Sequence, residues 1–438
     1  MKQEVASFLD YVAHSPTVFQ ATQQACDMLD AAGFTRLSEH EAWEILPGGR
    51  YYVTRNRSAL VAFAVPENGF THCQIVASHG DSPTFKLKAH AEGEAADAYI
   101  RLNVERYGGM IMSTWFDKPL SIAGRALVRD NGRLTTKLVD LERDAALIPN
   151  MPIHFNRDIN SGYSYNPQTD MLPLFGGKDA KGALAAEIAA KADAKEEDVV
   201  ACDLFLYNRT PASVWGANEE FFSCPRIDDL ECAATTLLGF LDASGETDSA
   251  CAPVWAMFDN EEVGSSSRMG AESSYLRDVL DRILEAVPHS AQASHRAMAN
   301  SFMLSADNAH ATHPNFPQKS DPCAPVRLGG GVVLKYNASQ KYTTNAVSGA
   351  IFRAICRKAD VPVQVFTNRA DEAGGSTLGN LQSHTLPIPM ADIGCAQFAM
   401  HSAVETASVA DAEAMTKAVA AFYRVHLRAL GDGTYTLE

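Results

Sequence analysis

The segment Asp259-Asn260-Glu261-Glu262-Val263-Gly264-Ser265 places two adjacent carboxylates just after an apolar run at residues 254–258. The run predicts a buried strand. Because an isolated carboxylate is very costly to bury, both glutamates must be solvated, paired or bound to a metal. Taken alone, the segment is most simply a turn with a solvated glutamate pair. The rest of the chain changes this interpretation, because other residues of metal-ligand type occupy similar junctions.

Composition excludes several classes of partner. A chain of 438 residues predicts two domains, or one domain with a large insertion. Its net charge of −16 argues against nucleic acid or an anionic membrane as the main partner. The nine cysteines contain no C-x-x-C pair and indicate small buried side chains in a reduced compartment. The sequence has neither a signal-peptide pattern nor a membrane-length apolar run, so we expect a cytoplasmic protein.

Strands and helices alternate over most of the chain. Helices are expected at residues 1–32 (two), 227–241, 275–287, 346–358 and about 403–428, the last with a capping box of Ser402 and Glu405. Strands are expected at residues 51–54, 59–65, 74–79, 254–258, 302–306, 332–336 and 361–366. This alternation predicts an α/β fold with a mixed, mostly parallel sheet sandwiched by helices.

One block has a different pattern. It contains expected strands at residues 101–104 and 109–114, a hairpin around Asn131-Gly132, and a polar stretch at 179–198 typical of an exposed helix or mobile loop. We therefore predict a β-rich inserted domain at 92–213, suited to assembly, within a discontinuous main domain of 1–91 and 214–438. His154 lies among apolar neighbours in this block. Alone, it is most simply a satisfied core or interface histidine.

Residues suited to metal binding follow the predicted strands of the main domain. They are His79, Glu261, Glu262, Asp307 and His401, and Asp81, two residues after His79, could orient that histidine. Ligands in α/β folds bind beyond the carboxyl ends of the strands. A surface turn would explain His79-Gly80-Asp81 taken alone, and ordinary helix capping would explain Asp228 and Asp229. The shared position at strand ends favours a common site.

The residue types indicate which metals would fit. Two histidines and several carboxylates suit zinc, manganese or cobalt. These candidates outnumber the ligands of one catalytic zinc and suit two ions sharing a bridging carboxylate. The adjacent Glu261 and Glu262 can then divide two roles, because one carboxylate binds metal while its neighbour acts as general base for the attacking water.

Five ordered segments resemble the motifs of the M18 aminopeptidases, the aspartyl aminopeptidase family, over nearly the whole chain. The segments are His79-Gly80-Asp81, Arg226-Ile227-Asp228, residues 259–265, residues 305–315, and Met400-His401-Ser402. The resemblance implies a dinuclear metallo-aminopeptidase with two divalent ions per subunit, most simply Zn²⁺, with Co²⁺ or Mn²⁺ as alternatives. It also implies dimers that assemble into a dodecamer.

The resemblance assigns roles to the site residues. Asp228 would bridge the two ions, and a non-proline cis peptide would follow it. His79 and Asp307 would complete one metal site, and Glu262 and His401 the other. Glu261 would be the general base, and Asp81 would orient His79.

Three further residues are implied at the substrate. Lys335 and His310 would bind the acidic side chain of an N-terminal Asp or Glu, and His154 would reach the active site of a neighbouring subunit. A segment at residues 374–377 resembles another part of the family's substrate pocket. Without the resemblance, Lys335 is a lysine that protects an edge strand, and His310 makes a supporting hydrogen bond.

Three functions follow, in order of preference. The first is a metal-dependent aminopeptidase that removes N-terminal acidic residues from peptides. The second is an amidohydrolase or deacylase that uses the same two ions to cleave N-acylated amino acids. The third is a non-catalytic assembly protein, which loss of a ligand or of Glu261 would have favoured.

Overall fold

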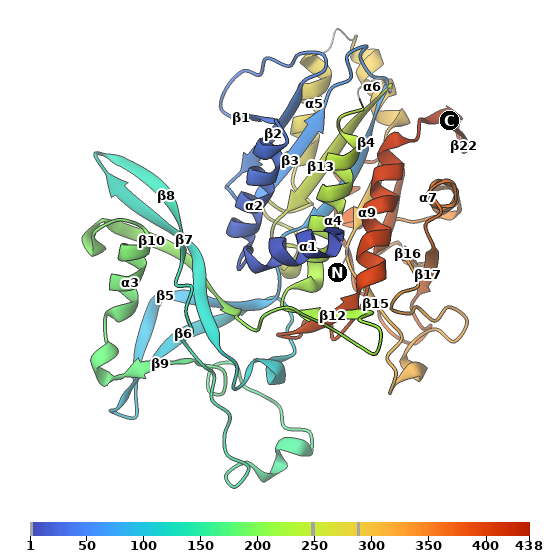
Figure 1. The fold of residues 1–438 in the computed structure, drawn as a ribbon. Helices are drawn as coiled ribbons and strands as arrows, with labels where there is room; N and C mark the ends of the chain where they lie inside the picture. Colours follow the sequence, from blue (N-terminus) through green and yellow to red (C-terminus); the bar gives the residue numbers. More distant parts are fainter. Residues whose placement is uncertain (1–2, 247–249, 287–289) are drawn as a thin grey trace.

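The structure is a computed structural model that describes residues 3–246, 250–286 and 290–438 (Figure 1). Among these residues the largest sheet has nine strands, in the order β1-β2-β3-β13-β4-β14-β18-β16-β17. Strands β13, β4, β14 and β18 run parallel, and β3 and β16 flank them antiparallel. The strand bounds are β1 Thr35–Leu37, β2 Arg50–Arg55, β3 Ala59–Ala64, β4 His72–His79, β13 Cys251–Phe258, β14 Phe302–Ala306, β16 Val332–Tyr336, β17 Val363–Thr367 and β18 Met390–Gly394.

Helices cover both faces of this sheet. Along β13, Trp255 and Met257 join a core with α1, α2, α4, α7 and α9, whereas Val254 and Ala256 join a second core with α5 and α6. A strand buried on both faces has a continuous apolar sequence, which explains the run at 254–258. The predicted α/β class is confirmed. The helices are α1 Gln3–Ala13, α2 Val18–Ala31, α4 Ile227–Ala243, α5 Tyr275–Ala286, α6 Ala291–Asn300, α7 Ala346–Lys358, α8 Leu378–Gln382 and α9 Val409–Arg424. Val287, the last residue of one expected helix, lies outside the described residues.

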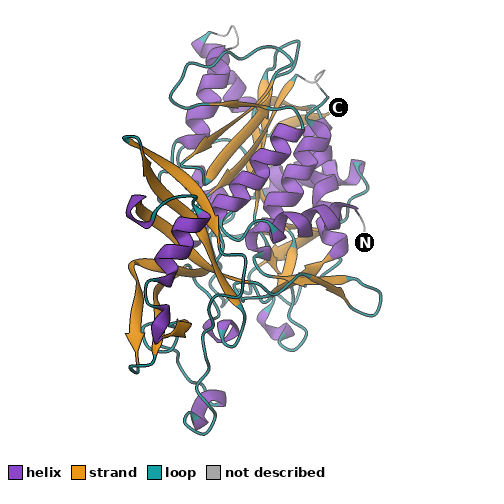
Figure 2. Cartoon of the chain, turned by 60° about the vertical axis from the view of Figure 1, so that its left-hand side comes forward, coloured by secondary structure: helices purple, strands orange, loops and turns teal. Residues whose placement is uncertain are grey.

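A second, antiparallel sheet projects to one side of the main body (Figures 1 and 2). Its order is β8-β7-β10-β5-β6-β9, and it encloses a core of its own. The predicted hairpin is confirmed, since Asp130 pairs with Arg133 across Asn131-Gly132. The polar stretch at 179–198 contains helix α3, Ala183–Lys191, whose Leu184 and Ile188 are buried rather than exposed. The strands are β5 Thr84–Ala95, β6 Tyr99–Tyr107, β7 Leu120–Asp130, β8 Arg133–Asp140, β9 Leu174–Gly177 and β10 Val199–Asn208.

Two details of this region differ from the sequence prediction. Strand β5 begins at Thr84 and crosses residue 92, so the sheet would place the boundary of the inserted domain earlier; the division of the chain into domains stays a prediction. The strand expected at 109–114 is wrong. This segment leads into a short helix at Met112–Trp115, and the backbone N–H of Ile111 donates to the carbonyl of His401 at 2.9 Å instead of joining a sheet.

A small third sheet corrects the expected C-terminal helix. Its order is β11-β12-β20-β19-β15. Glu405 lies within β20, and α9 begins after Ser408, whose hydroxyl accepts the backbone N–H of Ala410 at 3.3 Å. The capping box of Ser402 and Glu405 is therefore wrong. The bounds are β11 Ser213–Trp215, β12 Phe221–Cys224, β15 Ala309–His310, β19 Ala396–Phe398 and β20 Glu405–Ser408, and a terminal hairpin joins β21 Leu427–Gly431 to β22 Thr434–Leu437. None of the described helices has the length and apolarity that crossing a bilayer requires.

Candidate active site

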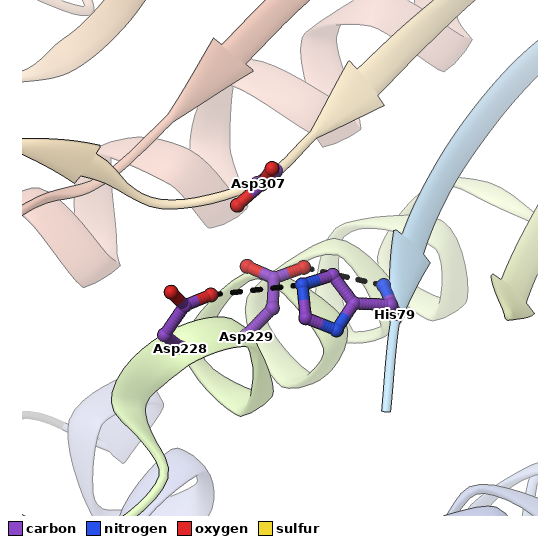
Figure 3. A group of neighbouring side chains, drawn as sticks. All are labelled: His79, Asp228, Asp229 and Asp307. Carbon is purple, nitrogen blue, oxygen red and sulfur yellow. Dashed lines mark hydrogen bonds and ion pairs between the residues drawn. The ribbon is translucent and has the colours of Figure 1, made fainter. Parts of the chain in front are cut away.

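Four side chains converge where β4, β14 and the start of α4 meet (Figure 3). His79 is the last residue of β4, Asp307 follows β14, and Asp228 and Asp229 lie in the first turn of α4. One ligand atom from each of the four residues lies within 4.8 Å of the others. His79 Nε2 is 3.6 Å from Asp228 Oδ1, and the His79 backbone N–H donates to Asp229 Oδ2 at 3.2 Å.

A second group shares Asp228. His401 Nε2 lies 3.3 Å from Asp228 Oδ2 and 3.4 Å from Glu262 Oε2. The other ring nitrogen of His401, Nδ1, contacts the carbonyl oxygen of Gly109. The two carboxylate oxygens of Asp228 thus face different histidines, one in each group.

Asp81 anchors the segment that carries the two glutamates. Its carboxylate accepts the backbone N–H groups of Glu261 and Glu262, each at 3.2 Å, and the Tyr107 hydroxyl at 2.7 Å. The same carboxylate lies 3.3 Å from His79 Nδ1. Asp81 therefore connects the end of β4 to the loop after β13.

The local backbone turns both glutamates towards the site. Asn260 adopts a left-handed conformation with φ of 63°, which asparagine tolerates better than most residues, and a short 3-10 turn follows at Glu261–Val263. The side chain of Glu262 is 3% exposed and contacts His401, whereas that of Glu261 is 16% exposed, with Oε2 3.9 Å from His79 Nε2. The peptide bond between Asp228 and Asp229 is cis, which confirms that expectation.

Crowding of buried carboxylates dominates the electrostatics. Burial, together with the nearby charge of Asp307, raises the pKa of Glu261 to about 8. Burial and Asp228 raise the pKa of Glu262 well above its usual range. Although burial opposes it, the carboxylates of Asp229 and Asp228 raise the pKa of His79. The site therefore concentrates negative charge that its own histidines offset incompletely.

The donor set fits divalent cations. Among the described residues, Asp228 Oδ1, Asp229 Oδ1 and Glu262 Oε1 are buried without a hydrogen-bond donor. Buried polar atoms are normally satisfied, so such atoms call for an additional partner. Two histidines and several carboxylates at ligand spacing suit zinc or a similar ion.

Lys335 lies beside the first group. It is 2% exposed, its ammonium donates to the carbonyl of Asn308 at 2.8 Å, and it lies 3.9 Å from Asp307 Oδ2. Its strand β16 is covered by β17, so the edge-strand interpretation of this lysine is wrong. His310 packs edge-on against Phe366 and keeps an exposed edge; partial loss of solvent around its ring and the Lys335 charge lower its pKa.

Neither His310 nor His154 belongs to the ligand groups found among the described residues. His154 lies on an exposed loop between β8 and β9, near the exposed side chains of Ile153 and Phe155. It is therefore not a core histidine.

Sequence reasoning gave Asp229 no role at the metals and missed Tyr107 and Glu405. The adjacent Asp228-Asp229 pair was a sequence signal for the role of Asp229. No local pattern pointed to Tyr107 or Glu405 as site residues.

Clustered histidines and carboxylates at the strand ends of an α/β fold indicate a metal-dependent enzyme. The family model "Aminopeptidase I zinc metalloprotease (M18)" matches residues 11–423. The chain is 40% identical over 439 residues to a Clostridium acetobutylicum protein described as "Probable M18 family aminopeptidase 2", covering 97% of this chain and 100% of that protein. A Clostridium novyi protein of the same description is 42% identical over 426 residues, covering 95% and 98%.

Similarity to solved structures points to the same family as the sequence matches. The chain resembles one chain of the Ape4 and Nbr1 complex with a TM-score of 0.93 and 33% identity, covering 96% of this chain and 85% of that one. It resembles the mApe1 dodecamer of S. cerevisiae with a TM-score of 0.85 and 25% identity, covering 96% of each chain. The chain belongs to the M18 family of zinc metallo-aminopeptidases and is a hydrolase. These matches do not favour the deacylase alternative.

Proposed function

We propose that this M18 aminopeptidase removes N-terminal Asp and Glu from peptides at a two-ion site. The observation that carries the acidic specificity is the buried ammonium of Lys335, 3.9 Å from the candidate ligand Asp307. A substrate side chain that reaches this position next to the reacting carbonyl would meet a cation. The Asn308 carbonyl accepts one hydrogen bond from the ammonium, which has three N–H donors in all.

Asp228 would bridge two zinc ions, with His79 and Asp307 on one and Glu262 and His401 on the other. Such ions, when bound, would polarise the scissile carbonyl and lower the pKa of a water molecule so that, once deprotonated, it can attack that carbonyl. Support comes from the geometry of Asp228, whose two oxygens face His79 at 3.6 Å and His401 at 3.3 Å.

Glu261 would take the proton of the attacking water and pass it to the leaving amine. Its side chain is more exposed than that of Glu262, 16% against 3%, so water reaches Glu261 more readily, while Glu262 contacts His401. Asp81 holds the backbone N–H groups of both glutamates, which fixes the base relative to the ligands. Positioned general bases of this kind contribute about 10²–10⁴-fold to rate.

His154 would complete the site of a neighbouring subunit, because its loop is exposed and carries the apolar side chains of Ile153 and Phe155. An exposed apolar loop favours burial against a partner. The mApe1 structure with a TM-score of 0.85 is a dodecamer, which supports a homo-oligomer here.

The specificity can be tested with Asp-, Glu-, Leu- and Lys-p-nitroanilides and zinc-loaded protein. We expect cleavage of the Asp and Glu substrates, and we expect Lys335→Met to lower kcat/KM for them at least 100-fold with little change for Leu. Lys358→Met, the same charge change on α7, is the matched control. Preferential cleavage of the Leu substrate by the wild type would refute acidic specificity while leaving the aminopeptidase assignment intact.

A further inference from the structure

Glu405 joins two residues of the candidate second metal site by accepting hydrogen bonds from their backbone N–H groups. Its side chain lies on β20, and the residue is 2% exposed. Oε2 accepts the backbone N–H of Asp228 at 3.1 Å, and Oε1 accepts the backbone N–H of His401 at 2.7 Å. One carboxylate thus fixes the backbone of two candidate ligands from distant parts of the chain.

Neither ligand has the backbone conformation of a regular helix or strand. His401 has φ of 69°, a left-handed conformation that is uncommon for residues other than glycine. Asp228 has φ of −80° and ψ of 109°, outside the helical range, although it lies in the first turn of α4. The carbonyl of each residue accepts one hydrogen bond, from the Ser82 hydroxyl to Asp228 at 2.7 Å and from the backbone N–H of Ile111 to His401 at 2.9 Å, whereas Glu405 accepts the N–H groups of both.

The same carboxylate extends towards the other metal site. Gln397 Nε2 donates to Glu405 Oε1 at 3.4 Å, and Gln397 Oε1 accepts from Asn308 Nδ2 at 2.6 Å. Asn308 follows Asp307 directly, and its carbonyl accepts the Lys335 ammonium. Glu405, Gln397 and Asn308 are all buried. They form a continuous polar connection beneath the two groups of candidate ligands.

We propose that Glu405 is a positioning residue that sets the separation of Asp228 and His401 and so gives the second metal site its affinity. It touches neither substrate nor the reacting atoms. The proposal rests on the two-ion site proposed above. Residues that orient metal ligands in this way typically contribute 10- to 100-fold to metal affinity.

The chain offers a matched control in Asp411. This buried carboxylate also accepts two backbone N–H groups, from Gly329 and Gly331, each at 2.7 Å. It holds a loop against the start of α9 and has no place in the ligand groups found among the described residues. Asp411→Asn therefore removes the same chemistry elsewhere in the core.

The test is a Zn²⁺ titration of the full-length wild type, Glu405→Gln, Asp411→Asn and His401→Ala against a chromogenic chelator, with the thermal midpoint of each metal-free protein measured in parallel. His401→Ala identifies the binding step that belongs to the second site. We expect Glu405→Gln to weaken that step 10- to 100-fold, with a smaller change at the other step. Asp411→Asn should lower the thermal midpoint comparably and leave both steps unchanged.

Two results would overturn the proposal. Unchanged zinc affinities in Glu405→Gln, with a lowered thermal midpoint, would make Glu405 a purely structural residue. Equal weakening of both steps in Glu405→Gln and Asp411→Asn would point to general loosening of the core. If the wild type binds a single Zn²⁺, the two-ion proposal is wrong, and the comparison of Glu405→Gln with Asp411→Asn on that ion still decides the role of Glu405.

Discussion

Replacing Asp81 with Asn should weaken the site without removing any proposed metal ligand. Asp81 Oδ1 accepts the backbone N–H of Glu261 and Oδ2 that of Glu262. An asparagine amide offers one oxygen, so either orientation turns its NH₂ towards one of these two donors. A hydrogen bond to a charged group contributes about 1.5–3 kcal/mol. Since about 1.4 kcal/mol of activation free energy corresponds to a tenfold change in rate, losing one such bond in the transition state predicts a fall in activity of about 10- to 100-fold.

The assay is kcat and KM for Asp-p-nitroanilide at saturating Zn²⁺, with bound zinc measured on the same samples. Tyr107→Phe is the companion variant, because it removes the hydroxyl donor at 2.7 Å and leaves Asp81 able to accept both backbone N–H groups. Tyr107→Phe should lower kcat less than Asp81→Asn does. If Asp81→Asn keeps kcat within about threefold of the wild type at unchanged zinc content, the loop is held by other contacts, and our account of how Asp81 positions the glutamates is wrong.

Three further predictions concern other parts of the chain. Glu261→Gln should lower kcat about 10²–10⁴-fold while zinc content stays at the wild-type level; retained activity would exclude Glu261 as the base. His154→Ala should lower the activity of the assembled protein without changing its size in sedimentation, and an unaffected kcat would count against a role at a neighbouring site. Burial and the stacked His426 lower the pKa of His72 to about 4. The free energy of unfolding should therefore fall by about 3 kcal/mol as the pH drops from 6.5 to 4. His72→Gln, but not the exposed His90→Gln, should reduce this loss in urea unfolding.

The sign of the His72 effect follows from proton binding. Between pH 4 and 6.5 the unfolded chain binds a proton at His72 that the folded protein excludes, so the folded protein is favoured at higher pH. This part of the stability is fully present above pH 6.5 and is lost as the pH falls. An acid sensitivity of His72→Gln equal to that of the wild type would contradict this reasoning.

Local pattern was sufficient for most of the main sheet. The apolar run at 254–258 and the His79 junction became β13 and the end of β4, because burial on both faces leaves a signal in the sequence itself. The expected strand at 109–114 failed for a tertiary reason. Its backbone hydrogen bond goes to His401, nearly three hundred residues away, and no local pattern carries that information.

Glu405 shows the same limit within the site. Its spacing from Ser402 fits a capping box, so the sequence alone favours a helix start there. In the folded chain its carboxylate instead binds the backbone of Asp228 and His401.

Local sequence patterns were enough to predict the fold class, the residue types suited to metal binding and their positions after strands. The family resemblance implied that Asp228 lies between His79 and His401, and the structure places it there. The contacts of Asp81 with both glutamates and of Glu405 with Asp228 and His401 could be seen only in the folded chain. This difference arises from the distance along the chain over which each kind of interaction acts. Periodicity and propensity act over a few residues, whereas the hydrogen bonds that orient these side chains join segments more than a hundred residues apart.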